Sequence, residues 1–371
     1  MINIPVAEIK IPDIIKPISD KIINGQRISA IEALELFKIN DLSVLSFLAS
    51  IKKRQINGKN VFFNRNIHIE PTNICINNCR FCSYRRNKNE DDSWELSIDQ
   101  IISIINNHIS DGITEVHIVG GTHPDKDAYY YSEMLKTIHK NFPFLHIKAF
   151  TAVELDYMFK KANLTIADGL ELLINSGLNS IPGGGAEIFN KEIRKKICPE
   201  KIAAEKWLEI HKEAHKYGIP SNATMLYGHL ESYEHRIEHM ELLRNMQDIT
   251  GGFQAFIPLK FRNKNNSLSY LPEVTLIEDL KNFAVSRLFI DNIKHIKAYW
   301  PMLGKDAAEI AILFGVDDLD GTIEDTTKIY TMAGAEEKNP SMTVDEITKI
   351  IKKTGSIPVE RNSVYDIIKI Y

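Results

Sequence analysis

Several features that define other classes of protein are scarce in this sequence of 371 residues. No apolar run reaches the ~20 residues that a membrane-spanning helix needs, and Glu8, Lys10 and Asp13 break up the apolar core that a signal peptide would require. The formal charge is only -4, with acidic and basic residues interspersed. We therefore expect no membrane segment, no nucleic-acid partner and a location in the reducing cytoplasm.

Cysteine is also rare, with four residues in the chain, but three of them lie together as Cys75, Cys79 and Cys82. Thiolates at this spacing can ligate three irons of a 4Fe-4S cluster. The fourth iron then has no local ligand, and it can bind the amino and carboxylate groups of S-adenosylmethionine. The motif predicts radical chemistry whose difficult step belongs to the cofactors.

Two alternatives to a cluster are considered. A zinc site would need a fourth donor, for which His68 or His123 is available. A disulfide is disfavoured by the odd number of neighbouring cysteines and by the absence of an export signal. The remaining cysteine, Cys198, is far downstream, and we interpret it as a small buried residue.

The pattern of apolar residues predicts an α/β fold. From about residue 61, short β-rich runs alternate with amphipathic helices, as in βα units of a parallel sheet. The predicted strands cover residues 66–70, 115–119, 146–150, 180, 224–226, 253–257, 295–299 and 319–323. This order favours a (β/α)8 TIM-type barrel over residues 61–325. Residues 1–60 and 326–371 are expected to be helical extensions, because each contains a capping box.

Residues with useful chemistry follow the predicted strands, at the end where such barrels carry their active sites. Gly120 and Gly121 would let the backbone approach a ligand, or would simply form a tight turn. Phe81 and Tyr84 are candidates for packing against an adenine, although either can equally belong to the core.

Two acidic residues are candidates for binding the ribose of the cofactor. Glu154 and Glu187 both follow predicted strands, and carboxylates accept hydrogen bonds from ribose hydroxyls. The alternative for Glu187 is a charge that interacts with the dipole at a helix N-terminus.

Histidines near strand ends are candidates for proton transfer, because imidazole titrates near neutral pH. His123, His229 and His295 are the three candidates, and each has the alternative of a structural role. The predicted substrate-binding residues are Tyr227, Arg262 and Lys297, of which the two cations suit a carboxylate.

Taken together, these motifs resemble those of the aminofutalosine synthases, radical SAM enzymes of the futalosine branch of menaquinone biosynthesis. The resembling segments are residues 75–84, 120–124, 146–154, 182–189, 197–199, 221–231, 251–259 and 295–304. Dehypoxanthine futalosine cyclases and deazaflavin-forming synthases share the cysteine loop and the glycine pair, but residues 146–154 and the pair Pro258-Leu259 favour the aminofutalosine synthases.

Two positions depart from the pattern of the family. Phe261-Arg262-Asn263 stands where a Phe-His-Pro is familiar, so no histidine role is carried over there, and Thr122 replaces an acid after the glycine pair.

The resemblance implies an enzyme with a 4Fe-4S cluster that consumes S-adenosylmethionine as a co-substrate. It implies that the 5'-deoxyadenosyl radical adds to the enol ether of 3-[(1-carboxyvinyl)oxy]benzoate, and that aryl migration and decarboxylation give aminofutalosine. A low-potential electron donor, such as flavodoxin or ferredoxin, is the implied partner.

Overall fold

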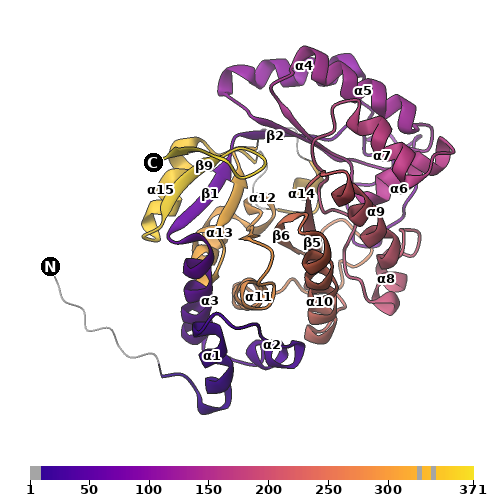
Figure 1. The fold of residues 1–371 in the computed structure, drawn as a ribbon. Coiled ribbons are helices and arrows are strands. Elements are labelled where there is room, and N and C mark those ends of the chain that lie inside the picture. The colour runs from indigo at the N-terminus through magenta and orange to yellow at the C-terminus, as the bar shows by residue number, and fades with distance from the viewer. Residues whose placement is uncertain (1–9, 324–327, 336–339) are drawn as a thin grey trace.

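The computed structural model describes residues 10–323, 328–335 and 340–371 (Figure 1). The residues before Lys10 and the expected domain boundary at 325–326 lie outside these ranges. Within the described residues, no helix is long and apolar enough to cross a membrane.

Three helices precede the barrel: α1 (Lys16–Ile23), α2 (Ala30–Phe37) and α3 (Leu42–Asn57), after a short 3-10 turn at Asp13–Ile15. The capping box of α2 forms as expected, because Ser29 accepts from the Glu32 amide and Glu32 accepts from the Ser29 amide. α3 ends at Gly58, whose φ of 62° suits glycine. α2 and α3 pack against α11 (Leu276–Phe289) on the outside of the barrel, and α1 packs against α3 (Figure 1).

The barrel strands appear at all the predicted positions. They are β2 (Asn66–Ile69), β3 (Glu115–Ile118), β4 (His146–Ala149), the bridge-forming residues Ser180 and Ile181, β5 (Ser221–Tyr227), β6 (Phe253–Lys260), β7 (His295–Ile296) and β8 (Asp318–Gly321). Every neighbouring pair is parallel, and single bridges join Lys148 to Ser180, Ile181 to Ser221 and Lys297 to Asp318. The predicted parallel α/β barrel is therefore confirmed.

A strand that we did not expect closes the ring. β1 (Asn60–Asn64) leads directly into β2 and pairs in parallel with β8. On its other side it pairs in parallel with β9 (Ile357–Arg361), which in turn pairs antiparallel with β10 (Ile367–Ile370). The C-terminal extension thus contains α15 (Val344–Lys353), whose capping box forms as expected, together with two strands where we expected helices alone. β9 escaped prediction because its partner β1 lies almost the whole chain away, and β10 pairs only with β9 in the described part of the chain.

Helices cover the outside of the barrel (Figure 1). They are α4 (Ile98–His108), α5 (Ala128–Asn141), α6 (Ala152–Lys161), α7 (Ile166–Ile174), α8 (Lys191–Ile197), α9 (Ala204–Lys216), α10 (Tyr233–Thr250), α11 and α13 (Lys305–Ala311), with 3-10 turns at Ile109–Asp111 and Ile312–Phe314. All residues of the short helix α12 (Trp300–Leu303) are buried, and its Met302 lines the cavity described below. A short helix, α14 (Ile329–Met332), follows β8.

The strands are buried on both faces, as the parallel sheet requires. On β5, Asn222, Thr224 and Leu226 line an interior cavity. Ala223 and Tyr227 alternate with them and are buried in the layer between strand and helix. This alternation determines which of the predicted residues can reach the cavity.

Candidate active site

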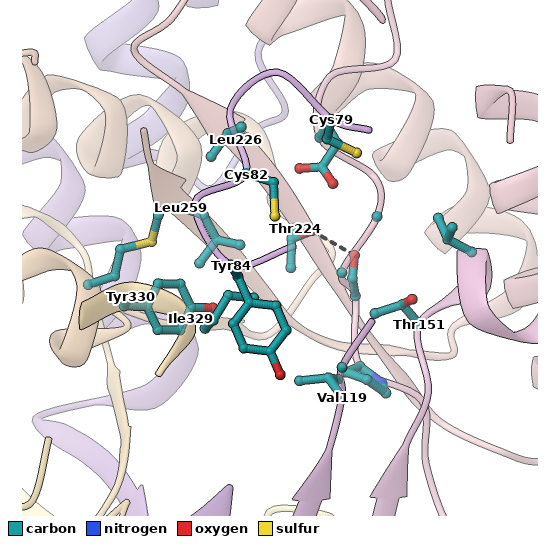
Figure 2. A pocket seen from close by; sticks show the side chains of 18 of the residues that line it. Cys79, Cys82, Tyr84, Val119, Thr151, Thr224, Leu226, Leu259, Ile329 and Tyr330 are labelled. Atoms are coloured by element: carbon teal, nitrogen blue, oxygen red, sulfur yellow. Dashed lines mark hydrogen bonds between the residues drawn. The ribbon is translucent and has the colours of Figure 1, made fainter. Parts of the chain in front are cut away.

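The C-terminal ends of the strands surround a cavity of about 250 Å³ (Figure 2). Cys75, Cys79 and Cys82 all line it. Figure 2 shows Cys79 and Cys82 with Thr224 and Tyr330 around the same space. The three cysteines therefore face the interior of the barrel, whereas Ile76, Asn78 and Arg80 of the same loop are exposed.

Amide groups surround two of the cysteine sulfur atoms. The Thr122 amide donates to Cys75 Sγ at 3.3 Å, and the Asn77 side-chain amide lies 3.9 Å from the same sulfur. The Arg85 amide donates to Cys82 Sγ at 3.4 Å. Hydrogen bonds of this kind stabilise thiolates that ligate an iron-sulfur cluster. The loop thus has the donor set and the surroundings that fit a cluster.

The zinc alternative finds no support in the geometry. Within the ranges that the structure describes, no three His, Cys, Asp or Glu side chains converge as a single metal ion would require. His68 lies on the barrel strand β2. His123 Nε2 faces Glu95 Oε2 at 3.3 Å.

The glycine pair holds the cysteine loop in place. Gly121 donates its amide to Thr72 O at 2.7 Å. A Cβ on Gly121 would meet Ile74 O at 2.2 Å, and one on Gly120 would meet Thr72 O at 2.8 Å. These glycines both line the cavity and allow two backbone segments to touch. The tight turn and the open backbone that we weighed as alternatives are thus both present.

Glu154 joins the glycine pair to the next strand. Its Oε1 accepts from the Gly120 amide at 3.2 Å, and its Oε2 accepts from the Thr151 amide at 2.8 Å, as part of the capping box of α6. Burial raises the pKa of Glu154 to about 7. Glu154 lines the cavity, but its oxygens already have backbone donors, so its main visible contribution is to position Gly120.

The other predicted cofactor residues also line the cavity. Glu187, with a left-handed φ of 49°, accepts from Lys201 Nζ at 2.6 Å. The Lys201 ammonium also lies 5.3 Å from the ring centre of Phe81. Tyr84 donates its hydroxyl to Thr72 O at 2.9 Å, so only its ring is available to a ligand. Lys201 was missed, and its sole sequence signal is its position shortly after Cys198.

Below these groups, the floor of the barrel is polar. His68, His117 and Lys148 pair directly across β2, β3 and β4, and all three line the cavity. Opposite them, Lys297 Nζ lies 2.7 Å from Asp320 Oδ1. Asp320 has φ of 68°, an uncommon conformation for a residue other than glycine. The sequence predicted only Lys297 among these residues as part of a substrate site, and it offered His68 only as a possible zinc donor. Alternate side chains of each barrel strand point inward, but this pattern did not single the others out.

The upper walls of the cavity are mostly apolar. Val119, Leu226, Ile257, Leu259, Phe261, Ile329 and Tyr330 line them. Arg262 also lines the cavity, but it donates from Nε to Met302 O at 3.0 Å and from Nη1 to Glu273 Oε2 at 2.9 Å. Such walls exclude water, and their apolar side chains can pack against an aromatic ring without reacting with it.

The structure corrects the prediction for Tyr227. Because Tyr227 alternates with the cavity-lining Thr224 and Leu226, its side chain lies between the strand and the helices. Its hydroxyl donates to Asp279 Oδ1 at 2.8 Å. A direct substrate contact is thus not available to it.

The three predicted catalytic histidines also lie outside the cavity lining. His295, the first residue of β7, lies at the opposite end of the barrel, where it faces Asp317 Oδ2 at 2.9 Å and stacks on Tyr365 at 3.7 Å between ring centres. His229 donates to Leu226 O and accepts from the Leu230 amide, so both ring nitrogens are used. The predicted catalytic role of His295 and His229 is therefore wrong. A position near a predicted strand end does not show at which end of the barrel a side chain lies, or on which face of the strand.

His123 is nearer to the site without entering it. Its Nδ1 accepts from the Asp125 amide at 3.1 Å, while its neighbour Thr122 contacts the cysteine loop. Burial lowers its pKa, so the ring is neutral at physiological pH. It fixes the segment after the glycine pair.

Residues 69–243 match the radical SAM superfamily, and residues 250–371 match the CofH/MqnC C-terminal region. The chain is 39% identical over 359 residues to aminodeoxyfutalosine synthase of Thermus thermophilus, covering 96% of each chain. It is 41% identical over 359 residues to 5-amino-6-(D-ribitylamino)uracil--L-tyrosine 4-hydroxyphenyl transferase of Methanocaldococcus jannaschii, covering 93% of this chain and 98% of the relative.

Solved structures support the same fold. The crystal structure of methylornithine synthase (PylB) matches with a TM-score of 0.74 at 17% identity, covering 92% of this chain and 96% of that one. The chain belongs to the radical SAM superfamily. More narrowly, it is one of the radical SAM enzymes that carry a CofH/MqnC C-terminal region. The predicted 4Fe-4S cluster and S-adenosylmethionine are accordingly its cofactors.

Proposed function

We propose that this protein is an aminodeoxyfutalosine synthase. It would join the 5'-deoxyadenosyl group of S-adenosylmethionine to 3-[(1-carboxyvinyl)oxy]benzoate, with rearrangement and decarboxylation. The products would be 6-amino-6-deoxyfutalosine and methionine, in menaquinone biosynthesis.

The observation that supports this proposal is the change in polarity along the cavity that the cysteines line. The cysteine loop lies at one end, apolar walls follow, and two ammonium groups, those of Lys148 and Lys297, line the floor together with one carboxylate, Asp320. Glu115, the partner of Lys148, does not line the cavity. A substrate with an aromatic ring and carboxylates fits this sequence of surfaces.

The chain's residues divide into two groups by role. Cys75, Cys79 and Cys82 would hold the cluster, which when bound supplies the electron that cleaves S-adenosylmethionine to a 5'-deoxyadenosyl radical. Gly120 and Gly121 would bring the backbone close to the cofactor, and Phe81, Tyr84, Glu154 and Glu187 would surround its nucleoside. Lys297, with Arg262 higher in the cavity, would orient the substrate, and the apolar walls would exclude water from the radical.

A basic surface next to the cysteine loop supports an acidic electron donor such as flavodoxin or ferredoxin. Arg80 follows Cys79, and its amide donates to Ile197 O at 2.8 Å, which brings the exposed Lys195 and Lys196 beside the loop. Reversing the charge at Lys195 and Lys196 should slow reduction of the cluster by flavodoxin, but not by dithionite. A reductive pathway of this kind is consistent with the cytoplasmic location that we propose.

Product analysis tests the proposed function. Cluster-loaded protein, incubated without oxygen with reductant, S-adenosylmethionine and the enol ether, should form 6-amino-6-deoxyfutalosine and methionine. A Cys75→Ala variant, which lacks one predicted cluster ligand, serves as the matched control. Formation of 5'-deoxyadenosine alone would contradict the proposal and indicate a hydrogen-abstracting enzyme such as the cyclase.

A second candidate function follows from the 41% identity to the Methanocaldococcus jannaschii transferase. That relative is named for a 4-hydroxyphenyl transfer between L-tyrosine and 5-amino-6-(D-ribitylamino)uracil. The same assay with these two substrates in place of the enol ether distinguishes the candidates. Turnover of tyrosine, with none of the enol ether, would replace our proposal by this one.

A further inference from the structure

The two histidines on the barrel floor form a pair. His68 and His117 are directly opposite each other in the register of β2 and β3, and their ring centres are 4.3 Å apart. His68 Nδ1 lies 3.3 Å from the Tyr299 hydroxyl, and Asn66 Nδ2 lies 3.4 Å from His68 Nε2. The pair is therefore fixed in position and faces the cavity.

The permanent cations of the floor are already balanced by carboxylates. Lys148 Nζ lies 2.7 Å from Glu115 Oε2, and Lys297 Nζ lies 2.7 Å from Asp320 Oδ1. Behind them, Arg361 Nη2 lies 2.6 Å from Asp318 Oδ2. A carboxylate that enters this floor finds ammonium groups to contact, but no net positive charge to offset its own.

The histidines are the groups that can change this balance. The charged and titratable groups that face the pair are Glu115 on β3, Lys148 on β4, Asp320 on β8, and Lys297 and Tyr299 in the segment after β7. Asp318, also on β8, lies 3.8 Å from Lys297 Nζ. In this set, Asp320 Oδ2 lies 3.9 Å from His68 Nε2. His117 Nε2 is buried and has no hydrogen-bond partner within the described ranges.

Both rings are neutral without a ligand. Burial lowers the pKa of His68 to about 4 and holds the pKa of His117 well below its usual value. A carboxylate in contact with the rings opposes this effect, because an anion at short range in a water-poor site favours the protonated imidazole. Two protons are excluded, since two imidazolium ions at this distance would repel each other.

We propose that His68 and His117 together take up one proton from the solvent when a dicarboxylate binds on the barrel floor. The pair thereby supplies the positive charge that the paired lysines cannot, and both histidines act as positioning residues for the substrate. The proposal rests on the proposed function, from which the double negative charge of the substrate follows.

Calorimetry with a stable substrate analogue tests the proposal. The saturated ether 3-(carboxymethoxy)benzoate is titrated into cluster-loaded protein, with S-adenosylmethionine and without reductant, in two buffers of different ionisation enthalpy. At pH 7.5 we expect an uptake of about one proton per ligand, with a Kd that rises about tenfold for each pH unit between pH 7 and 8.5. Binding without proton uptake would overturn the proposal and leave the proposed function standing.

Variants locate the proton. In the double variant His68→Gln/His117→Gln, uptake and pH dependence should disappear, and Kd at pH 7 should rise about tenfold or more. His211→Gln is the matched control, because His211 is fully buried on α9, outside the cavity. Unchanged uptake in the double variant would contradict the proposal by assigning the proton to another group. Absence of binding to the wild-type protein at every pH would contradict both the proposal and the proposed function.

Discussion

The two ends of the cavity are built in different ways. At the cysteine end, the contacts are made mainly by backbone groups: the Thr122 and Arg85 amides donate to sulfur, and Gly121 packs against the backbone of Ile74. At the floor, the contacts are made by side chains, as in the ion pair between Lys148 and Glu115. One end depends on close approach of the chain to itself, and the other on compensated charge.

This difference determines how each end responds to substitution. A change at the cysteine end alters the position of sulfur atoms and therefore the ability to hold a cluster. A change at the floor leaves a buried charge without its partner, which affects the stability of the whole barrel. The following predictions test that division.

The largest effect is expected at the cysteines. Replacing any of Cys75, Cys79 or Cys82 by Ala should reduce cluster iron to background and abolish activity, because only three thiolates are available as ligands. Cys198→Ala should retain the cluster, since Cys198 is buried and does not line the cavity. Iron and sulfide analysis after anaerobic reconstitution measures both. Normal iron in a triplet variant would contradict the assignment.

Gly121→Ala should impair the cluster through the backbone alone. The added Cβ would meet Ile74 O at 2.2 Å, so the cysteine loop must move. Gly355→Ala is the control: Gly355 has φ of 72° with open space around it. It should cost about 1 kcal/mol of unfolding free energy and leave the iron content unchanged. If both variants retained full iron, the close contact would be irrelevant to the cluster.

Lys148→Met should act mainly on stability. Its loss leaves Glu115 as an unpaired buried charge, which costs about 3 kcal/mol. The double variant Lys148→Met/Glu115→Gln should recover more than half of that loss, because it removes both charges. Denaturant unfolding of the apoprotein measures both values. Equal instability of the single and the double variant would show that the pair contributes packing and not charge compensation.

Substitution of Glu154 should have a smaller effect, which is on the pH dependence of the free energy of unfolding. Burial raises its pKa from 4.5 to about 7, so the folded protein binds this proton more tightly than the unfolded chain does. Its contribution to stability is therefore complete below pH 4.5 and declines as the pH rises through 7. Glu154→Gln should remove on the order of 2 kcal/mol of that decline between pH 5 and 8. If the free energies of unfolding of the wild type and of Glu154→Gln changed with pH in the same way, this role of Glu154 would be ruled out.

Tyr227→Phe should have the smallest effect. It removes the hydrogen bond to Asp279, which is worth about 1 kcal/mol of unfolding free energy. Because Tyr227 lies outside the cavity, KM for the enol ether should not change. A raised KM would restore the substrate-binding role that we first predicted for it.

The cysteine end could be predicted from the sequence because its signals are local. The cysteine spacing, the adjacent glycines Gly120 and Gly121, and the capping pair Thr151 and Glu154 can each be recognised within a few positions of the sequence, although the segments that they bring together are far apart in the chain. The barrel itself could be predicted because a regular alternation of strands and helices has few compatible folds.

The floor could not be predicted in the same way. His68, His117 and Lys148 are neighbours only through the register of three strands, which no local pattern specifies. The same limitation explains His295, which is on the correct strand but at the wrong end, and Tyr227, which is on the correct strand but on the wrong face.

The position of β1 between β8 and β9 has a consequence for biosynthesis of the protein. β1, which continues into β2 and then the cysteine loop, pairs among the described residues only with strands that lie far along the chain, β8 (Asp318–Gly321) and β9 (Ile357–Arg361). Iron and sulfide are therefore expected to be inserted only after β8 and β9 have been synthesised, and a polypeptide that stops before them would expose its thiols to oxidation.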